Sequence, residues 1–175
     1  SDWDAILLND ISLGKNNPWT PINEYSGTFD GNGHFINDLY IVSSSSNQAL
    51  FGKTADDATI KNLGVSGTVK TTGNNTINTA GIVAEAVTGT KIENCTNAVQ
   101  VTGIRNVGGI VGRAWGKTII SNCYNTGAIN ANQFAGGVIG QISIASGEQK
   151  LITVKQCYNT GIVSAIYGSI GAITY

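Results

Sequence analysis

The chain has 175 residues, a formal net charge of -1, and charged side chains at only 12% of positions. This length suits one domain. The near-neutral charge excludes the clustered Lys and Arg by which proteins hold nucleic acid or an anionic membrane surface. No stretch of about 18 apolar residues occurs, so we expect no membrane insertion.

The composition predicts the kind of element that follows along the chain. Glycine is abundant, with 23 residues, whereas proline is rare, with 2. Asn, Thr, Ser, Ile and Val supply much of the rest, a mixture that favours many short strands joined by tight turns. The three cysteines are an odd number and do not make a complete disulfide framework.

Residues 1–25 are predicted to be an N-terminal lead-in and cap. They contain Trp3, the apolar run Ala5-Ile-Leu-Leu8 and the segment Trp19-Thr-Pro-Ile22. Their bulky side chains can cover the first repeat of the region that follows, residues 26–175.

A glycine-rich run, Asp30-Gly-Asn-Gly-His34, opens this second region. A phosphate-binding loop would need a helix directly after it, whereas Phe35-Ile36 and a strand-like segment follow here. We therefore predict a tight turn that places Asn and Gly at positive φ. His34 is the only histidine, which leaves no zinc set and no triad, so we expect an exposed surface residue.

The rest of the chain repeats one unit. The first motif occurs as Ile60-Lys-Asn-Leu, Ile92-Glu-Asn-Cys, Ile120-Ser-Asn-Cys and Val154-Lys-Gln-Cys, with a looser copy at Ile36-Asn-Asp-Leu39. The second motif follows each of them as Ala49-Leu-Phe-Gly52, Ala80-Gly-Ile-Val, Gly108-Gly-Ile-Val, Gly136-Gly-Val-Ile and Gly171-Ala-Ile-Thr174. Cys95 and Cys123 are 28 residues apart, and the spacing lengthens only at polar patches, as in a solenoid.

The apolar runs are short, rich in β-branched residues and flanked by glycine, which argues against helices. They predict about three strands per repeat. We predict an all-β fold, a right-handed parallel β-helix of about five coils, in which equivalent residues stack about 4.8 Å apart. Three inward columns follow, and an amide column beside them has Asp38 at its head and can hydrogen-bond from coil to coil. The columns are Ile36, Ile60, Ile92, Ile120 and Val154; Leu39, Leu63, Cys95, Cys123 and Cys157; Ile82, Ile110, Val138 and Ile173; and the amides Asn62, Asn94, Asn122 and Gln156.

The runs Gly108-Gly-Ile-Val-Gly112, Gly136-Gly-Val-Ile-Gly140, Asn122-Cys-Tyr-Asn-Thr-Gly127 and Gln156-Cys-Tyr-Asn-Thr-Gly161 resemble the GLUG-motif repeats of bacterial surface proteins. Ser26–Ile41 and the lead-in resemble the segments that precede such repeats, so the resemblance covers nearly the whole chain. It implies an extracellular or wall-attached bacterial module, of the kind found in adhesin-like proteins and in the N-terminal regions of some IgA-cleaving metallopeptidases. It implies no catalytic residue.

Two classes of function remain open: a non-catalytic surface module, and a carbohydrate-processing enzyme or its sugar-binding part. A hydrolase needs at least two carboxylates at one sugar bond, and Arg105 and Arg113 lie without a cluster of acids. The acids are scattered at Asp2, Asp4, Asp10, Glu24, Asp30, Asp38, Asp56, Asp57, Glu85, Glu93 and Glu148. We therefore expect no catalytic residues, no metal and no cofactor, with a stalk, adhesin or binding segment as the function.

Tyr40, Tyr124 and Tyr158 are the candidate ligand-binding residues. Each follows the inward Leu/Cys column by one residue and should face outward, where Tyr124 and Tyr158 stack. Such aromatic platforms suit glycans or a host surface protein, although stacked tyrosines also stabilise a sheet without any ligand. The three cysteines are expected to be free buried thiols, because side chains on parallel neighbours point inward side by side.

The last residues, Ile170-Gly-Ala-Ile-Thr-Tyr175, fall inside a predicted strand, with no polar cap after them. An open coil exposes unpaired N–H and C=O groups and apolar side chains. We therefore expect that the chain is a piece of a longer protein and that the piece alone self-associates through its C-terminal coil.

Overall fold

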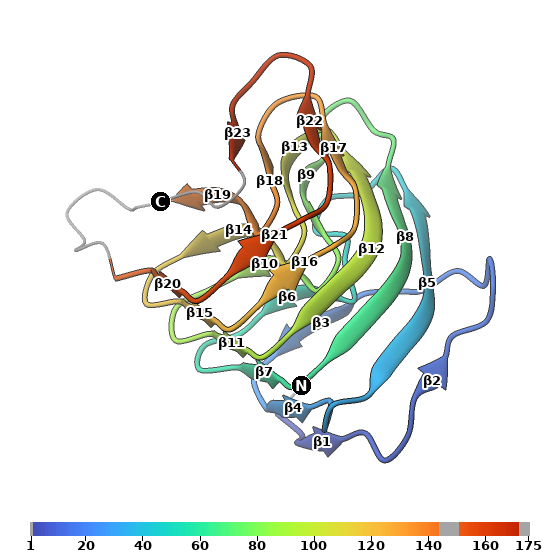
Figure 1. The fold of residues 1–175 in the computed structure, drawn as a ribbon, viewed down its shortest axis with the longest axis vertical. Helices are drawn as coiled ribbons and strands as arrows, with labels where there is room; N and C mark the ends of the chain where they lie inside the picture. Colours follow the sequence, from blue (N-terminus) through green and yellow to red (C-terminus); the bar gives the residue numbers. More distant parts are fainter. Residues whose placement is uncertain (1, 144–150, 172–175) are drawn as a thin grey trace.

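The computed structural model describes residues 2–143 and 151–171. Within these ranges the chain forms 23 strands and no helix, and the paired strands run parallel (Figure 1). The chain winds repeatedly through the same four sheets, which confirms the parallel β-helix of about five coils predicted from the sequence. Since the described residues contain no helix, none of them forms a helix able to cross a membrane.

We number the coils along the chain. Coil 1 comprises residues 28–54, coil 2 residues 59–86, coil 3 residues 91–115, coil 4 residues 119–143 and coil 5 residues 153–171. Residues 5–25 form a further coil, here called the lead-in coil. It stacks on coil 1 through the parallel pairs Ala5↔Phe29, Ile11↔Ile36 and Ile22↔Phe51.

Coils 2 to 4 each contribute one strand or more to every sheet, whereas coil 1 has no strand in the third sheet and coil 5 no described strand in the fourth. The first sheet contains β1 (Ala5–Ile6), β4 (Thr28–Asp30), β7 (Thr59–Lys61), β11 (Lys91–Glu93), β15 (Ile119–Ser121) and β20 (Thr153–Lys155). The second sheet contains β2 (Ile11–Ser12), β5 (Phe35–Ser43), β8 (Gly64–Thr71), β12 (Thr96–Gly103), β16 (Tyr124–Asn125), β17 (Ile129–Ala131), β21 (Tyr158–Asn159) and β22 (Val163–Ala165).

The other two sheets close the coil. The third contains β9 (Ile77–Ala80), β13 (Arg105–Gly108), β18 (Ala135–Gly136) and β23 (Ile170–Gly171). The fourth contains β3 (Ile22–Tyr25), β6 (Phe51–Thr54), β10 (Val83–Ala86), β14 (Val111–Trp115) and β19 (Ile139–Ser143). Four sheets therefore replace the three strands per repeat that the sequence predicted.

The difference arises at the paired glycines, which form a corner instead of lying within one strand. β13 ends at Gly108 and β14 begins at Val111. A Cβ on Gly108 would overlap the carbonyl oxygen of Val111, and one on Gly109 would overlap the carbonyl oxygen of Gly137 in the next coil. Only glycine allows the backbone to turn this tightly while a neighbouring coil lies against it.

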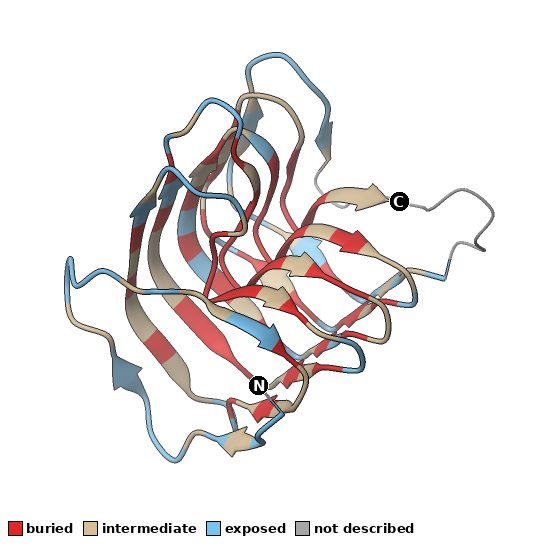
Figure 2. Ribbon diagram, turned by 180° about the vertical axis from the view of Figure 1, so that it is seen from behind, coloured by how far each residue is buried: buried red, intermediate tan, exposed pale blue. Residues whose placement is uncertain are grey.

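The predicted inward columns are confirmed in coils 2 to 5. Ile60, Ile92, Ile120 and Val154 are register partners, and the first three are fully buried. Ile82, Ile110 and Val138 are also buried, as are the free thiols of Cys95, Cys123 and Cys157. Figure 2 shows buried residues along the inside of successive coils. Ile173, the last predicted member of one column, lies outside the described residues.

The prediction is wrong in coil 1. Phe29, not Ile36, is the partner of Ile60. Ile36 pairs with Val65 and Leu39 with Gly67, so both lie in the second sheet and outside the predicted columns. Asp38 does not head the amide column; it accepts a hydrogen bond from the Ser12 hydroxyl instead (2.6 Å).

The run Ile36-Asn-Asp-Leu39 is not the copy of the first motif in coil 1. Phe29 stands at the position of Ile60, so Ile36 lies seven residues too late in the chain. A turn separates the two: Asp30 pairs with Lys61 and Phe35 with Gly64, so four residues connect these strands in coil 1 where two suffice in coil 2. The four residues are Gly31 to His34, within the run predicted to be a tight turn, and Asn32 and Gly33 have the expected positive φ values of 51° and 81°.

Candidate functional site

Tyr124 and Tyr158 form a stacked pair on the outside of the second sheet. They are register partners in β16 and β21, with ring centroids 5.1 Å apart and ring planes 3° apart. This separation is close to the spacing of about 4.8 Å between neighbouring strands, so the two rings stack along the axis of the coils. The predicted stacking of the two tyrosines is present, and Tyr158 is exposed.

Tyr40 does not belong to this pair. It pairs with Thr68, five residues after Phe35 in coil 1 and four residues after Gly64 in coil 2. It lies at a separate depression of about 140 Å³ together with Lys15, Asn16 and Asp38. Because coil 1 aligns with the repeat through Phe29 and not Ile36, Phe35 takes the position that the sequence had assigned to Tyr40.

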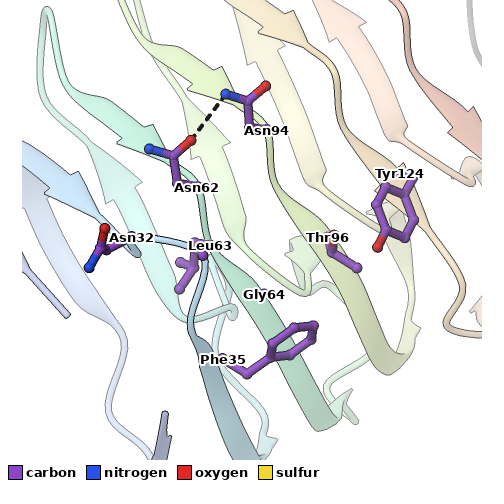
Figure 3. Close-up of a pocket in the computed structure, with 9 residues that line it drawn as sticks. Asn32, Phe35, Asn62, Leu63, Gly64, Asn94, Thr96 and Tyr124 are labelled. Atoms are coloured by element: carbon purple, nitrogen blue, oxygen red, sulfur yellow. Dashed lines mark hydrogen bonds between the residues drawn. The ribbon is translucent and has the colours of Figure 1, made fainter. Parts of the chain in front are cut away.

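The aligned outward column is therefore Phe35, Gly64, Thr96, Tyr124 and Tyr158, one residue from each coil. The small residues in coils 2 and 3 leave a groove of about 510 Å³ between the aromatic ones (Figure 3). Its lining comes from four consecutive coils: Asn32, Gly33, Phe35, Asn62, Leu63, Gly64, Asn94, Thr96 and Tyr124. We call it the aromatic groove.

The floor of the groove depends on Gly64. A Cβ at this position would overlap the ring of Phe35, so the glycine lets that ring lean across coil 2 towards Thr96. In Figure 3 the hydroxyl of Tyr124 points back towards Thr96 from the other side. Thr96, half-buried at the centre, is thus flanked by an aromatic side chain in each direction along the stack.

One wall of the groove is a ladder of amides. Asn94 Nδ2 donates to Asn62 Oδ1 (3.0 Å), and Asn62 Nδ2 donates to Asp30 Oδ1 (2.9 Å). Both asparagines have positive φ, as do Asn122 and Gln156 at the same turn of coils 4 and 5. Asparagine tolerates this conformation better than most residues, which explains its recurrence at the turn. The predicted amide column is thus hydrogen-bonded in coils 1 to 3, with Asp30 instead of Asp38 at its head.

Asp30 is held as a carboxylate. It accepts hydrogen bonds from the side chain of Asn62 and the backbone N–H of Asn32 (2.8 Å), and Lys61 lies 3.4 Å away. These contacts, the Asn62 bond first, hold its pKa below the usual value of 3.8. Asp30 and Lys61 also balance each other's charge beside the groove.

A second amide ladder, which the sequence analysis missed, fixes the strands that carry the aromatic column. Asn97 Nδ2 donates to Asn125 Oδ1, and Asn125 Nδ2 to Asn159 Oδ1, each over 2.6 Å. These residues directly follow Thr96, Tyr124 and Tyr158, and because strand side chains alternate they point into the core. The repeated Tyr-Asn-Thr-Gly sequence was the signal, since an inward polar residue needs a hydrogen-bond partner.

The other candidates remain separate from the groove. His34 is half-buried beside Asp10, whose Oδ1 lies 3.1 Å from Nδ1 and also accepts the Phe35 N–H (2.9 Å). Both bonds, the backbone one first, lower the pKa of Asp10. Across the described ranges, no three His, Cys, Asp or Glu side chains are placed to hold a metal ion.

Comparison with known proteins supports the repeat and the fold. Residues 103–130 match the family model described as the GLUG motif, so the resemblance stated from the sequence is confirmed and the chain carries this motif. A crystal structure of a candidate immunoglobulin A1 protease from Bacteroides ovatus is similar, with a TM-score of 0.59 and 19% identity over 99% of this chain and 78% of that one. At this identity the similarity concerns the fold. No curated protein matches the sequence.

Proposed function

We propose that the chain is a non-catalytic repeat module of a bacterial surface or secreted protein and that it binds glycans in the aromatic groove. The observation that carries this proposal is the stacked pair Tyr124–Tyr158 at one end of a groove whose wall is an ordered amide ladder. A stalk or adhesin segment would present such a face repeatedly along its length.

Two kinds of contact in the groove suit a sugar. The C–H face of a pyranose packs against the uncovered face of an aromatic ring, which favours Phe35 and Tyr124 as platforms. Sugar hydroxyl groups both donate and accept hydrogen bonds, as the amides of Asn62 and Asn94 do. Ligand sites commonly combine an apolar surface with a few placed polar groups in this way.

The location proposed for the module is outside the cell or on its surface. The GLUG motif at residues 103–130 supports it, because the family resemblance implies this setting. The free buried thiols do not indicate a location, since they serve as packing groups in the core. A host surface protein would be the alternative ligand.

The absence of catalysis is part of the proposal. Glycoside hydrolysis requires two carboxyl groups, one of them protonated at the start of the reaction. The residues that line the groove include no carboxylate, and the adjacent Asp30 has a lowered pKa that opposes the role of general acid. The alternative, a polysaccharide-processing enzyme, would need acids from elsewhere in the chain.

A glycan array probed with the labelled chain and with Tyr124→Ala tests the proposal. We expect the intact chain to retain a defined set of glycans and Tyr124→Ala to lose them. Tyr167→Ala is the matched control, because Tyr167 is 83% exposed and lies outside the groove. If no glycan is retained, or if the two variants lose binding equally, the groove is not a glycan site.

A further inference from the structure

We infer that the ligand of the aromatic groove is an uncharged, linear polysaccharide whose extended chain lies along the stacking axis of the coils. This inference rests on the proposed function and specifies its ligand class. Three features carry it: the direction of the groove, the charge of its lining, and the fixed orientation of its amides.

The direction follows from the origin of the lining residues. They occupy the same turn of coils 1 to 4, so the groove crosses the strands and follows the axis of the solenoid. The coils of Phe35 and Tyr124 are three steps apart, about 14 Å at about 4.8 Å per step. The Phe35 ring leans over Gly64 and Tyr124 lies on the other side of Thr96, so a chain that follows the groove meets Phe35, Thr96 and Tyr124 in turn.

The amide wall has a consequence for recognition. The side chains of Asn62 and Asn94 recur in successive coils, so successive units of a chain can meet the same kind of hydrogen-bonding group. A globular ligand or a single sugar would use one step of this arrangement, whereas a polymer of repeated units uses all of them. Tyr158, which is exposed, continues the outward column into coil 5 in the same direction.

The lining determines the charge class of the ligand. Phe35, Leu63, Gly64, Thr96 and the amides carry no charge, and the nearby Asp30 and Lys61 are paired with each other over 3.4 Å. An acidic polysaccharide would require Arg or Lys directed at its carboxylate or sulfate groups. The lining offers hydrogen bonds without charge, which suits neutral hydroxyl groups.

The amides are ordered before any ligand arrives. The ladder bond of Asn94 uses one of its two amide hydrogens, and Asn62 uses one hydrogen and one lone pair. Each amide therefore keeps a donor and an acceptor for a hydroxyl group. Because neighbouring coils already fix the side chains, little further ordering is needed on binding.

Calorimetry with uncharged β-linked glucan oligomers, from the disaccharide to the hexasaccharide, tests the inference. We expect affinity to rise with length until the oligomer spans the groove from Phe35 to Tyr124, and then to level off. Oligogalacturonates of the same lengths serve as the acidic probe and should bind at least about tenfold more weakly.

Three variants test where the oligosaccharide binds on the protein. Thr96→Trp fills the middle of the groove and should abolish binding of the longer oligomers. Asn94→Gly removes the amide but keeps the backbone freedom needed at φ 54°, and should weaken binding by about tenfold. Asn16→Gly, at another exposed asparagine with positive φ (58°), is the matched control and should bind as the unchanged chain does.

The outcomes separate the inference from the proposed function. If the disaccharide binds as tightly as the hexasaccharide, or if only the acidic oligomers bind, the inference is overturned while glycan binding stands. Unchanged binding by Thr96→Trp would also overturn it. If neither series binds and the glycan array is blank, the proposed function itself has failed.

Discussion

Coils 2 to 4, which have a coil stacked on each side, and coil 5 contain the same kinds of inward residue but bury them to different extents. Ile120 and Ile129 in coil 4 are fully buried, whereas their partners Val154 and Val163 in coil 5 are only partly buried. Within the described ranges no strand pairs with the outer edges of β20 to β23. The difference shows that a coil cannot bury its own inward face: stacking on both sides does so.

The outward residues of the two coils differ in kind as well. Asn132 and Gln133 of coil 4 correspond to Ile166 and Tyr167 of coil 5, which are 66% and 83% exposed. Ile162 and Ile170 are exposed beside them. Apolar residues at positions that are polar one coil earlier mark a surface suited to contact with another protein surface.

The largest expected effect is on the stability of coils 2 to 4. Ile110→Asp places a charge without a partner in a fully buried column, which costs about 3–5 kcal/mol or more out of a total stability of about 5–15 kcal/mol. We expect the variant to be unfolded or insoluble by circular dichroism and solubility. Thr102→Asp, a half-buried β12 residue paired with Lys70, should fold normally. If Ile110→Asp melts like the unchanged chain, the inward assignment is wrong.

A matched pair of side-chain truncations compares how much inward residues of coils 4 and 5 contribute to stability. Ile129→Ala should lower the free energy of unfolding by about 2–5 kcal/mol, because it leaves a cavity in a closed core. Val163→Ala, at the register partner in coil 5, should cost about 1 kcal/mol, because its site is partly open to water. Urea denaturation followed by circular dichroism compares them, and equal losses would show that coil 5 is covered in solution.

The repeat made most of this fold predictable. Motifs of constant order identified the columns of coils 2 to 5, because one stacked arrangement satisfies every copy. Coil 1 was misaligned because Ile36-Asn-Asp-Leu39 is similar in sequence to the first motif, whereas the residue aligned with Ile60 is Phe29. The four-residue turn Gly31 to His34 replaces the two-residue turn at Asn62 and Leu63, so the motif spacing of the other coils does not recur in coil 1.

The candidate site was predicted in part. Tyr124 and Tyr158 could be placed because they lie in regular copies of the repeat, next to Cys123 and Cys157. Phe35 could not, because its position depends on the same turn length, and Tyr40 was chosen in its place. The groove itself depends on Gly64, whose importance is the approach of the Phe35 ring from another coil, a contact between residues far apart in the chain.

Self-association should follow from the surface of coil 5. We expect sedimentation velocity to show association that increases with concentration, because apolar side chains and free strand edges favour contact. The double variant Ile166→Asn and Tyr167→Gln gives coil 5 the polar residues found at the equivalent positions of coil 4, and it should weaken the association. Ser164→Asn is a control at an exposed polar position of the same coil. A strictly monomeric unchanged chain at high concentration would contradict this expectation.

The smallest contrast lies within the column of thiols. Cys95 and Cys123 are completely buried, and Cys157 in coil 5 is 9% exposed. For Cys157 the interaction with the Cys123 thiol, and then burial, raise the pKa well above the usual range. For Cys123 the interaction with Cys157 lowers the pKa, but the interaction with Cys95 and burial outweigh it, and the net shift is upward. Since the thiolate is the reactive form, Cys123 and Cys157 should react slowly at neutral pH, and Cys95 should react slowly because it is completely buried.

Labelling with a thiol reagent, followed by mass spectrometry of the peptides, therefore should give one order. Cys157 reacts first, because it lies in coil 5, on which no further described strand is stacked. Local opening of such a coil requires less free energy than opening of the interior. Cys95 and Cys123 follow together at the rate of global opening, and all three react fully in denaturant. Raising the pH should accelerate Cys157 most, because its thiolate forms in a partly open site. Equal rates at the three positions would mean that coil 5 opens only with the rest of the chain, and rapid labelling of all three would place the column on the surface.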